Sequence, residues 1–200
     1  MKREEKTKLT RQKIIDAGIA EFGSNGYEKA NINSISGAGI AKGLIYHNFA
    51  TKDELYLECL RACFDEITEA LACPDSIADY SVYFNKRICL FREKREVAAM
   101  VLEALINPPK IHLEKIAEIR TQYDRMNAEW ITKILEKCEL RDGVTSESAF
   151  RYLTLMQDMF NWYFTNPKFD RNKPKDLIEL HESELPRIFE FMLRGVLKGE

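Results

Sequence analysis

The sequence has few of the features that mark a disulfide-bonded, zinc-binding or membrane protein. Its five cysteines among 200 residues are odd in number and lack paired CxxC spacing, so neither a disulfide framework nor a zinc site is indicated. Cys59 and Cys63 lie four residues apart, where a redox pair or a metal site is the alternative to two small buried hydrophobic side chains. No apolar run approaches the roughly 18 residues that a membrane span needs, and Met1–Leu9 is charged throughout rather than basic and then apolar. We therefore expect a cytoplasmic protein without membrane contact.

Catalytic and cofactor motifs are equally scarce. A glycine run over residues 37–43 mimics a dinucleotide-binding loop, but no apolar strand precedes it and Lys42 stands where the third glycine usually lies. His112 and His181 lie near acids, yet neither pairs with a second histidine or with a cysteine at ligand spacing, so we expect both on the surface. The sequence carries no nucleophile elbow or zinc-protease signature. We predict no enzyme activity, no cofactor and no metal site.

What the sequence does contain is a helical composition with an uneven distribution of charge. Hydrophobic residues make up 45% of the chain, which is enough to bury a sizeable core. Helix formers dominate and alternation with period two is rare, so we predict an all-α fold. Residues 1–52 carry nine basic and five acidic side chains, an excess of four positive charges within a chain whose net charge is −2. The remainder is therefore acidic, and such asymmetry is expected when one end of a protein meets a polyanion.

Two short helical segments near the amino terminus carry the clearest functional pattern. Apolar residues recur on one side of Arg11–Phe22, and the Asn25-Gly26 pair supplies a turn that ends this first helix. Residues Ala38–Phe49 then predict the turn and second helix of a DNA-reading helix-turn-helix. Its first two residues, Ala38 and Gly39, are small, as the tight corner between two crossing helices requires.

The predicted second helix has one apolar and one polar face. Ile40, Ile45 and Phe49 point inward at helical spacing. The opposite face carries hydrogen-bond donors and almost no acid, as suits phosphates and base edges, and consists of Lys42, Gly43, Tyr46, His47 and Asn48.

A capping box follows this segment and predicts the start of a fourth helix at Thr51. The Thr51 hydroxyl can accept a hydrogen bond from the third helical amide, while the carboxylate of Glu54 reaches back to the amide of Thr51.

One family pattern matches in register from Thr10 to Leu60, roughly a quarter of the chain. The matched positions are Thr10-Arg11, Ala17-Gly18, Phe22, Gly26-Tyr27, Ala38-Gly39, Lys42-Gly43, Tyr46 with Phe49, and Lys52. They resemble the amino-terminal domain of the tetracycline-repressor (TetR, AcrR-like) family of bacterial transcription regulators. In two departures, one residue fewer than usual lies between Ile35 and Ala38, and Ala41 replaces the usual hydroxyl cap of the recognition helix. Losing such a cap typically costs about 1 kcal/mol of helix stability.

The resemblance implies a helix-turn-helix DNA-binding domain in residues 1–52 and a helical effector-binding and dimerisation domain in residues 53–200. It implies a ligand-responsive regulator, a repressor that a small apolar effector releases from a palindromic operator in double-stranded DNA. The alternative is a helical ligand-binding or adaptor protein whose degenerate helix-turn-helix no longer reads DNA. The predicted DNA-binding residues are Asn31, Ala41, Lys42, Gly43, Leu44, Tyr46, His47, Asn48 and Lys52.

Within this set we expect three roles. Lys42, Tyr46 and Lys52 would contact phosphates, Lys52 with help from the positive end of its own helix. Lys42, Leu44 and His47 would read bases, and Gly43 would let the helix approach the groove closely. Tyr46 could instead belong to the core.

The rest of the chain predicts successive helices divided by breaks. Cys73-Pro74, Asn107-Pro108-Pro109 and Arg141-Asp142-Gly143 end helices, residues 166–174 form a loop, and Pro186 predicts a kink or a restart at Ser183. The predicted helices are Glu54–Ala72, Ser76–Glu93, Val97–Ile106, Ile111–Cys138, Ser146–Phe164 and a last one ending at Leu197.

Aromatic and methionine side chains in this region suggest an adaptable apolar pocket, with plain core packing as the alternative. The pocket candidates are Tyr83, Phe84, Met100, Tyr123, Met126, Trp130, Met156 and Phe160. They favour a neutral or weakly polar aromatic or lipidic effector, an expectation that charged residues buried among them can reverse. The helix that begins at Thr51 would transmit effector binding to the DNA-reading head. The resemblance also implies a homodimer formed by the last two helices, with Phe160, Tyr163, Phe189 and Leu193 as its contacts.

Overall fold

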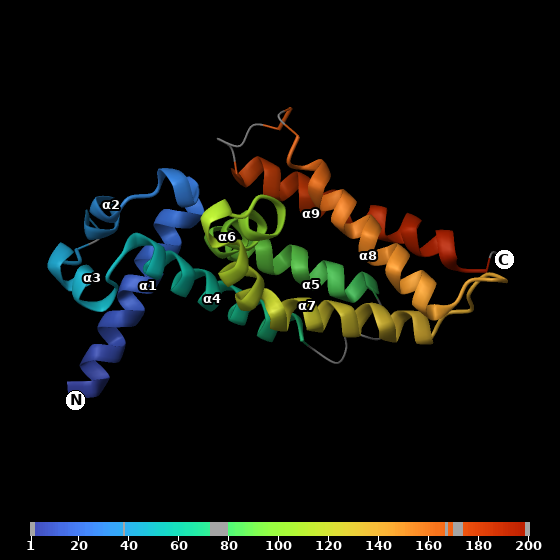
Figure 1. Cartoon of the computed structure of the whole chain (residues 1–200), viewed down its shortest axis with the longest axis horizontal. Coiled ribbons are helices and arrows are strands. Elements are labelled where there is room, and N and C mark those ends of the chain that lie inside the picture. Colours follow the sequence, from blue (N-terminus) through green and yellow to red (C-terminus); the bar gives the residue numbers. More distant parts are fainter. Residues whose placement is uncertain (1–2, 38, 73–79, 167, 170–173, 199–200) are drawn as a thin grey trace. The chain divides into compact units, whose positions relative to one another are not determined.

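The computed structural model describes residues 3–37, 39–72, 80–166, 168–169 and 174–198. Across these ranges the regular structure is helical (Figure 1), which confirms the predicted all-α fold. Three predicted features, the corner residue Ala38, the Cys73-Pro74 break and a helix start at Ser76, lie outside the described residues. The elements are α1 (Arg3–Lys29), α2 (Ile32–Gly37), α3 (Lys42–Asn48), α4 (Lys52–Leu71), α5 (Tyr80–Glu93), α6 (Arg95–Ile106), the 3-10 turn η2 (Lys110–His112), α7 (Leu113–Glu136), α8 (Ser146–Tyr163) and α9 (Pro174–Val196).

Local sequence signals set two of the boundaries. Gly26 adopts a φ of 72°, a left-handed conformation that interrupts α1 at the predicted turn. The Thr51 hydroxyl accepts from the amide of Glu54 at 3.0 Å, as predicted for the start of α4. The return bond differs from the prediction, because the Glu54 carboxylate accepts from the amide of Ala50 at 2.7 Å and not from that of Thr51.

The prediction of a helix restart at Ser183 is wrong. α9 continues through Pro186 as one helix from Pro174 to Val196. A proline inside a helix removes one backbone hydrogen bond at a cost of about 3 kcal/mol. Buried apolar side chains on both sides of Pro186, including Leu185 and Phe189, compensate for that loss.

The chain divides into two compact units. Unit 1 contains the described residues up to Glu66 together with Lys94–Arg120, and unit 2 contains Ile67–Glu93 and the residues from Thr121 onward. α4 and α7 each contribute to both units. Unit 1 thus includes residues on both sides of position 52, where the sequence predicts the boundary between the DNA-binding and effector-binding domains. That division by function stays a prediction.

Unit 1 is held together by close packing of helices on α1. A Cβ atom added to Gly23 would lie 2.4 Å from the carbonyl oxygen of Glu96, so the backbones of α1 and α6 touch there. A Cβ atom added to Gly18 would lie 2.6 Å from Sγ of Cys59, so α4 packs on α1 there through a side chain. The helix-turn-helix region therefore shares one core with α6.

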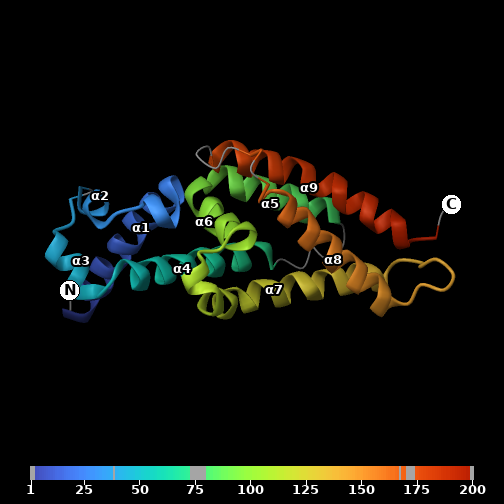
Figure 2. The ribbon, with the colours of Figure 1, turned by 45° about the horizontal axis from the view of Figure 1, so that its top comes forward.

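Unit 2 is a bundle of long helices. Figures 1 and 2 both show α8 and α9 side by side, and α5 also packs on α9. Its core includes the buried side chains of Phe84, Trp130, Leu153 and Phe189.

Candidate functional site

The short helix α3 presents a polar face to solvent. Its buried side is formed by Ile45 and by Phe49, which follows the helix, as predicted, whereas Ile40 is only half-buried. Tyr46 is 47% exposed, so the alternative that it belongs to the core is wrong. The exposed residues of this face are Ala41, Lys42, Gly43, Leu44, Tyr46 and His47. It carries no acidic side chain and is free to meet a polyanion.

Arg11 of α1 fixes the end of α3. Its guanidinium donates to the carbonyl oxygen of Asn48 at 3.3 Å and lies 4.3 Å from the centre of the Phe49 ring. It also forms an ion pair with Glu58 of α4 at 2.9 Å. Three helices thus converge on one side chain, and Asn48 itself is half-buried with its amide nitrogen bonded to the carbonyl oxygen of Leu44.

The two helices of the motif differ in how they begin. Asn31 caps α2, because its side-chain oxygen accepts from the amides of Asn33 at 2.7 Å and Ser34 at 3.2 Å. Ala41 precedes α3 and provides no side-chain cap, as the sequence predicted. The first turn of the seven-residue α3 therefore lacks a stabilising contact that related helices usually have.

Lys52 lies apart from the α3 face. Its ammonium group is 3.4 Å from the carbonyl oxygen of Glu28 and 4.7 Å from the centre of the Tyr27 ring. A phosphate contact by Lys52 stays a prediction, and it requires the side chain to turn away from these partners.

Tyr27 joins α1 to the rest of unit 1. Its hydroxyl donates to Asp53 at 2.6 Å, its amide donates to Glu103 of α6 at 3.1 Å, and Nε2 of His112 lies 3.2 Å from its hydroxyl oxygen. His112 is buried by these contacts, so the expectation of a surface position is wrong. Burial and the Asp53 hydrogen bond raise the pKa of Tyr27 above its ordinary range, and burial raises the pKa of Glu103.

Only part of the predicted pocket comes together. Tyr83, Phe84 and Trp130 line a cavity in unit 2. Met100 belongs to unit 1, where its Sδ lies 3.8 Å from Sγ of Cys63, and it does not line this cavity. The remaining candidates, Tyr123, Met126, Met156 and Phe160, are not among the residues that line this cavity.

Aromatic side chains fill most of the space in this region. The cavity measures about 20 Å³, enough for one water molecule and far below the ~300–1,000 Å³ of a typical ligand pocket. Tyr83 stacks on Trp130 with ring centroids 4.2 Å apart, and Phe189 lies 5.1 Å from Trp130. A ligand of ring size has to displace side chains to enter.

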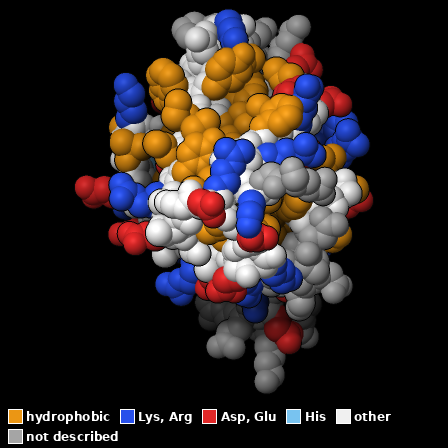
Figure 3. Space-filling view, turned by 90° about the vertical axis from the view of Figure 1, so that its right-hand side faces the viewer, with side chains coloured by type: hydrophobic (Ala, Val, Ile, Leu, Met, Phe, Trp, Pro, Cys, Tyr) orange, Lys and Arg blue, Asp and Glu red, His pale blue; other side chains and the backbone are white. Residues whose placement is uncertain are grey.

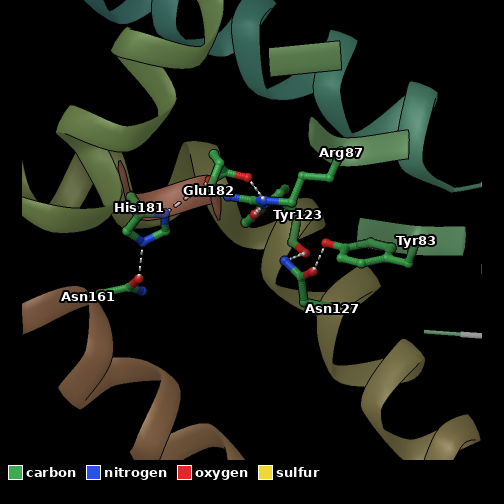
Figure 4. A network of polar contacts seen from close by, with 7 residues as sticks. All are labelled: Tyr83, Arg87, Tyr123, Asn127, Asn161, His181 and Glu182. Atoms are coloured by element: carbon green, nitrogen blue, oxygen red, sulfur yellow. Dashed lines mark hydrogen bonds and ion pairs between the residues drawn. The ribbon is translucent and has the colours of Figure 1, made fainter. Parts of the chain in front are cut away.

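A buried polar network adjoins the cavity and was missed by the sequence analysis. Arg87 of α5 donates through Nε and Nη2 to the two carboxylate oxygens of Glu182 of α9, at 2.7 and 2.8 Å (Figure 4). Its Nη1 donates to the hydroxyl of Tyr123, and Tyr83 donates to Asn127 at 2.8 Å. The signal was present, because Arg87 and Glu182 both occupy core positions within apolar stripes of their helices.

His181 completes the network and is also buried, contrary to expectation. Its Nδ1 lies 3.0 Å from Glu182 and its Nε2 lies 3.0 Å from Asn161 of α8. Burial would raise the pKa of Glu182, but the charge of Arg87 and the hydrogen bonds from His181 and Arg87 lower it to about 2. Burial lowers the pKa of His181, which favours the neutral imidazole.

The predicted dimer contacts fall into two groups. Phe189 and Leu193 are buried within their own chain, and Phe160 is half-buried against Phe164 and His181, whereas Tyr163 is exposed. The exposed apolar side chains on α8 form a row that we call the α8 stripe, and Figure 3 shows hydrophobic side chains gathered on this side of unit 2. The α8 stripe comprises Tyr152, Leu155, Met159, Trp162 and Tyr163.

Three further findings bear on the expectations from the sequence. Cys59 and Cys63 are buried and burial raises the pKa of both thiols, which disfavours the reactive thiolate. Among the described residues, no group of three or more His, Cys, Asp or Glu side chains could hold a metal ion. None of the helices in the described ranges is long and apolar enough to cross a membrane.

Known proteins match the chain most clearly at its amino terminus. Residues 14–59 match the family described as bacterial regulatory proteins, tetR family. A relative from Staphylococcus aureus (strain Newman), the biofilm operon icaADBC HTH-type negative transcriptional regulator IcaR, is 27% identical over 73 residues, which is 36% of this chain and 39% of the relative. The match thus spans well under half the length of the first curated relatives. The fatty acid metabolism regulator protein of Bacillus subtilis (strain 168) is 22% identical over 169 residues, 78% of this chain and 85% of that protein.

Solved structures extend the similarity in fold to the whole chain. The transcriptional regulator FadR from Bacillus subtilis, solved in complex with stearoyl-CoA, superposes with a TM-score of 0.61 at 21% identity. The superposition covers 92% of this chain and 98% of that one. At this identity the likeness concerns the fold, and it includes the helices of unit 2 as well as the amino-terminal motif.

Proposed function

Because this chain belongs to the TetR family of bacterial regulatory proteins, we propose that it is a transcription regulator that binds operator DNA through α3 and responds to a small organic effector. The observation that carries the proposal is the exposed, acid-free face of α3, whose buried side is fixed by Ile45 and Phe49. Lys42 and Tyr46 supply phosphate contacts, and His47 and Leu44 face the base edges.

A second copy of the chain completes the regulator. One seven-residue helix contacts too few base pairs for useful specificity, so two copies are needed on a palindromic site with half-sites about one helical turn or a multiple apart. The α8 stripe provides the apolar surface for this contact in place of Phe189 and Leu193. Its members are already exposed, so dimerisation needs no rearrangement of the core.

We propose that the protein acts as a repressor in the cytoplasm and that an effector bound in unit 2 releases it from DNA. Support for repression comes from the relative IcaR, which is a negative transcriptional regulator. Support for an effector comes from FadR, which was solved with stearoyl-CoA. The elements α4 and α7 contribute to both units and are the route by which effector binding reaches the head.

The competing function is a helical ligand-binding or adaptor protein that does not read DNA. The uncapped first turn of α3 is the observation that favours it, because an unstable recognition helix weakens specific binding. The two functions differ in whether a specific DNA complex forms.

Fluorescence anisotropy with labelled fragments upstream of the chain's own gene tests the proposal. At moderate salt and with excess competitor DNA, we expect a specific complex that Lys42→Ala weakens on all sequences and that His47→Ala weakens at particular bases. Lys133→Ala is the matched control, since Lys133 is an exposed lysine of α7 far along the chain from α3. Binding that never exceeds the non-specific background, or equal losses in Lys42→Ala and Lys133→Ala, would favour the adaptor.

A further inference from the structure

The Arg87–Glu182 ion pair adjoins the cavity in unit 2, and of the two residues only Arg87 lines it. Arg87 lines the cavity together with Tyr83, Trp130 and Phe189, so a guanidinium group borders a space that aromatic and aliphatic side chains mostly enclose. Both members of the pair are almost completely buried, Arg87 at 3% and Glu182 at 4% exposure. A mostly apolar cavity with a few convergent polar groups is the usual form of a ligand site.

Stability alone does not explain the pair. Removing two charges from water is costly, and well-packed apolar residues at such positions are often as stable or more stable. Arg87 and Glu182 also interrupt apolar stripes, with Phe84 and Phe91 on either side of Arg87 along α5 and Ile178 and Leu185 flanking Glu182 on α9. A role in recognition accounts for charges placed where apolar residues would pack.

The polar network as a whole carries no net charge. The negative charge of Glu182 balances the positive charge of Arg87, to which it is joined by two hydrogen bonds. His181 is hydrogen-bonded to Glu182 and Asn161. A carboxylate entering the cavity would compete with Glu182 for Arg87, and a displaced Glu182 would stay buried without its ion-pair partner. An ammonium group would meet the converse problem with Arg87.

Neutral hydrogen-bonding groups are available to an uncharged ligand. The carboxamide of Gln157 lines the same cavity and can bond a hydroxyl or carbonyl oxygen, whereas that of Asn127, which also lines it, is bonded to Tyr83 and to the carbonyl oxygen of Tyr123. Met192 also lines it, and the flexibility of its side chain allows the wall to adapt when a ring enters.

We propose that the Arg87–Glu182 pair makes this cavity selective for uncharged effectors, namely aromatic alcohols, ketones or amides, and excludes carboxylates and ammonium compounds of the same shape. The proposal rests on the effector response included in the proposed function and specifies its ligand class. The two buried charges cancel each other, so they do not reverse the preference for a neutral effector that the sequence predicts.

Three probes that share one ring and differ in charge test the proposal: naphthalenemethanol, naphthoate and naphthylmethylammonium. Isothermal titration calorimetry on the full chain without DNA at neutral pH should show that the alcohol binds at least about tenfold more tightly than either ion, a difference of about 1.4 kcal/mol. An ion that binds as tightly as the alcohol, or failure of all three probes to bind, overturns the proposal.

Charge-changing variants separate recognition from a structural role. Glu182→Gln leaves Arg87 unmatched and should shift the preference toward naphthoate, whereas Arg87→Met leaves Glu182 unmatched and should shift it toward naphthylmethylammonium. Glu190→Gln is the matched control, since Glu190 pairs with Arg194 on the surface of α9 at 2.6 Å and should leave all three affinities unchanged. Variants that fold but keep the wild-type order of affinities contradict the proposal.

If a variant does not fold, the wild-type series still decides the question. Because no DNA is present, loss of operator binding cannot affect the outcome. The measurement thus fails or succeeds independently of the proposed regulatory function.

Discussion

Replacing Gly43 with alanine should stabilise the protein and weaken DNA binding at the same time. Gly43 lies in the first turn of α3, its φ is not positive, and an added Cβ atom would meet no heavy atom within 4 Å. The methyl group therefore causes no clash in the free protein. Alanine reduces the conformational freedom of the unfolded chain, so we expect the free energy of unfolding to rise by about 0.5–1 kcal/mol.

The same methyl group would project from the face that we assign to DNA. If α3 lies close to the groove at this position, the dissociation constant for operator DNA should rise about tenfold, equivalent to about 1.4 kcal/mol. Urea unfolding and fluorescence anisotropy on the same preparation measure the two effects. A variant that binds operator DNA as well as the wild type would show that Gly43 does not approach DNA, and a less stable variant would refute the steric argument.

Gly23→Ala provides the structural contrast. Its Cβ atom would lie 2.4 Å from the carbonyl oxygen of Glu96 and 2.7 Å from its Cα atom, both backbone atoms that cannot turn aside. We expect a loss of about 1–3 kcal/mol in the free energy of unfolding. Opposite signs at two glycines of the same unit distinguish a glycine packed against a neighbouring backbone from a glycine in open space.

Acid should weaken unit 2, because Glu182 has a pKa of about 2 in the folded chain, below its ordinary value. Its contribution to stability is complete above the ordinary pKa and is lost as the pH falls toward 2. Urea unfolding at stepped pH should show this decline. Iodoacetamide should label exposed Cys89 in the folded chain and buried Cys63 only after unfolding, since burial raises the pKa of the Cys63 thiol. Labelling of Cys63 in the folded chain, detected by mass spectrometry, would contradict this burial. Trp162→Asp should convert a dimer into a monomer by light scattering, whereas Leu9→Asp, which changes an exposed leucine of α1, should not; a wild-type monomer at micromolar concentration would remove the dimer from the proposal.

Short-range signals in the sequence were reliable guides to the amino-terminal motif. Gly26 ends the first part of α1 because only a left-handed residue suits the turn, and Thr51 begins α4 because its hydroxyl satisfies a free amide. Periodicity alone identified Ile45 and Phe49 as the inward side of α3. Each of these features depends on residues within a few positions of one another.

Features that depend on distant partners escaped prediction. Arg87 and Glu182 are 95 residues apart, and the sequence does not indicate that one compensates the other. His112 has no histidine or cysteine at ligand spacing, which predicts a surface position, whereas the partner that it contacts in the core, Tyr27, lies 85 residues away. The chemistry of Pro186 alone predicts a kink or a restart at Ser183, whereas α9 continues past the proline with buried residues on both sides of it.

The close fit of α6 against α1 limits how this protein could be recombined with its relatives. A chimeric regulator joined at residue 52 would take Gly23 and Tyr27 away from the helix that they contact. Gly23 would then face a foreign backbone in place of Glu96, and the amide of Tyr27 would lose the carboxylate of Glu103 as its acceptor. A transplanted reading head should therefore keep its native specificity and stability only if residues 94–120 are transferred with it.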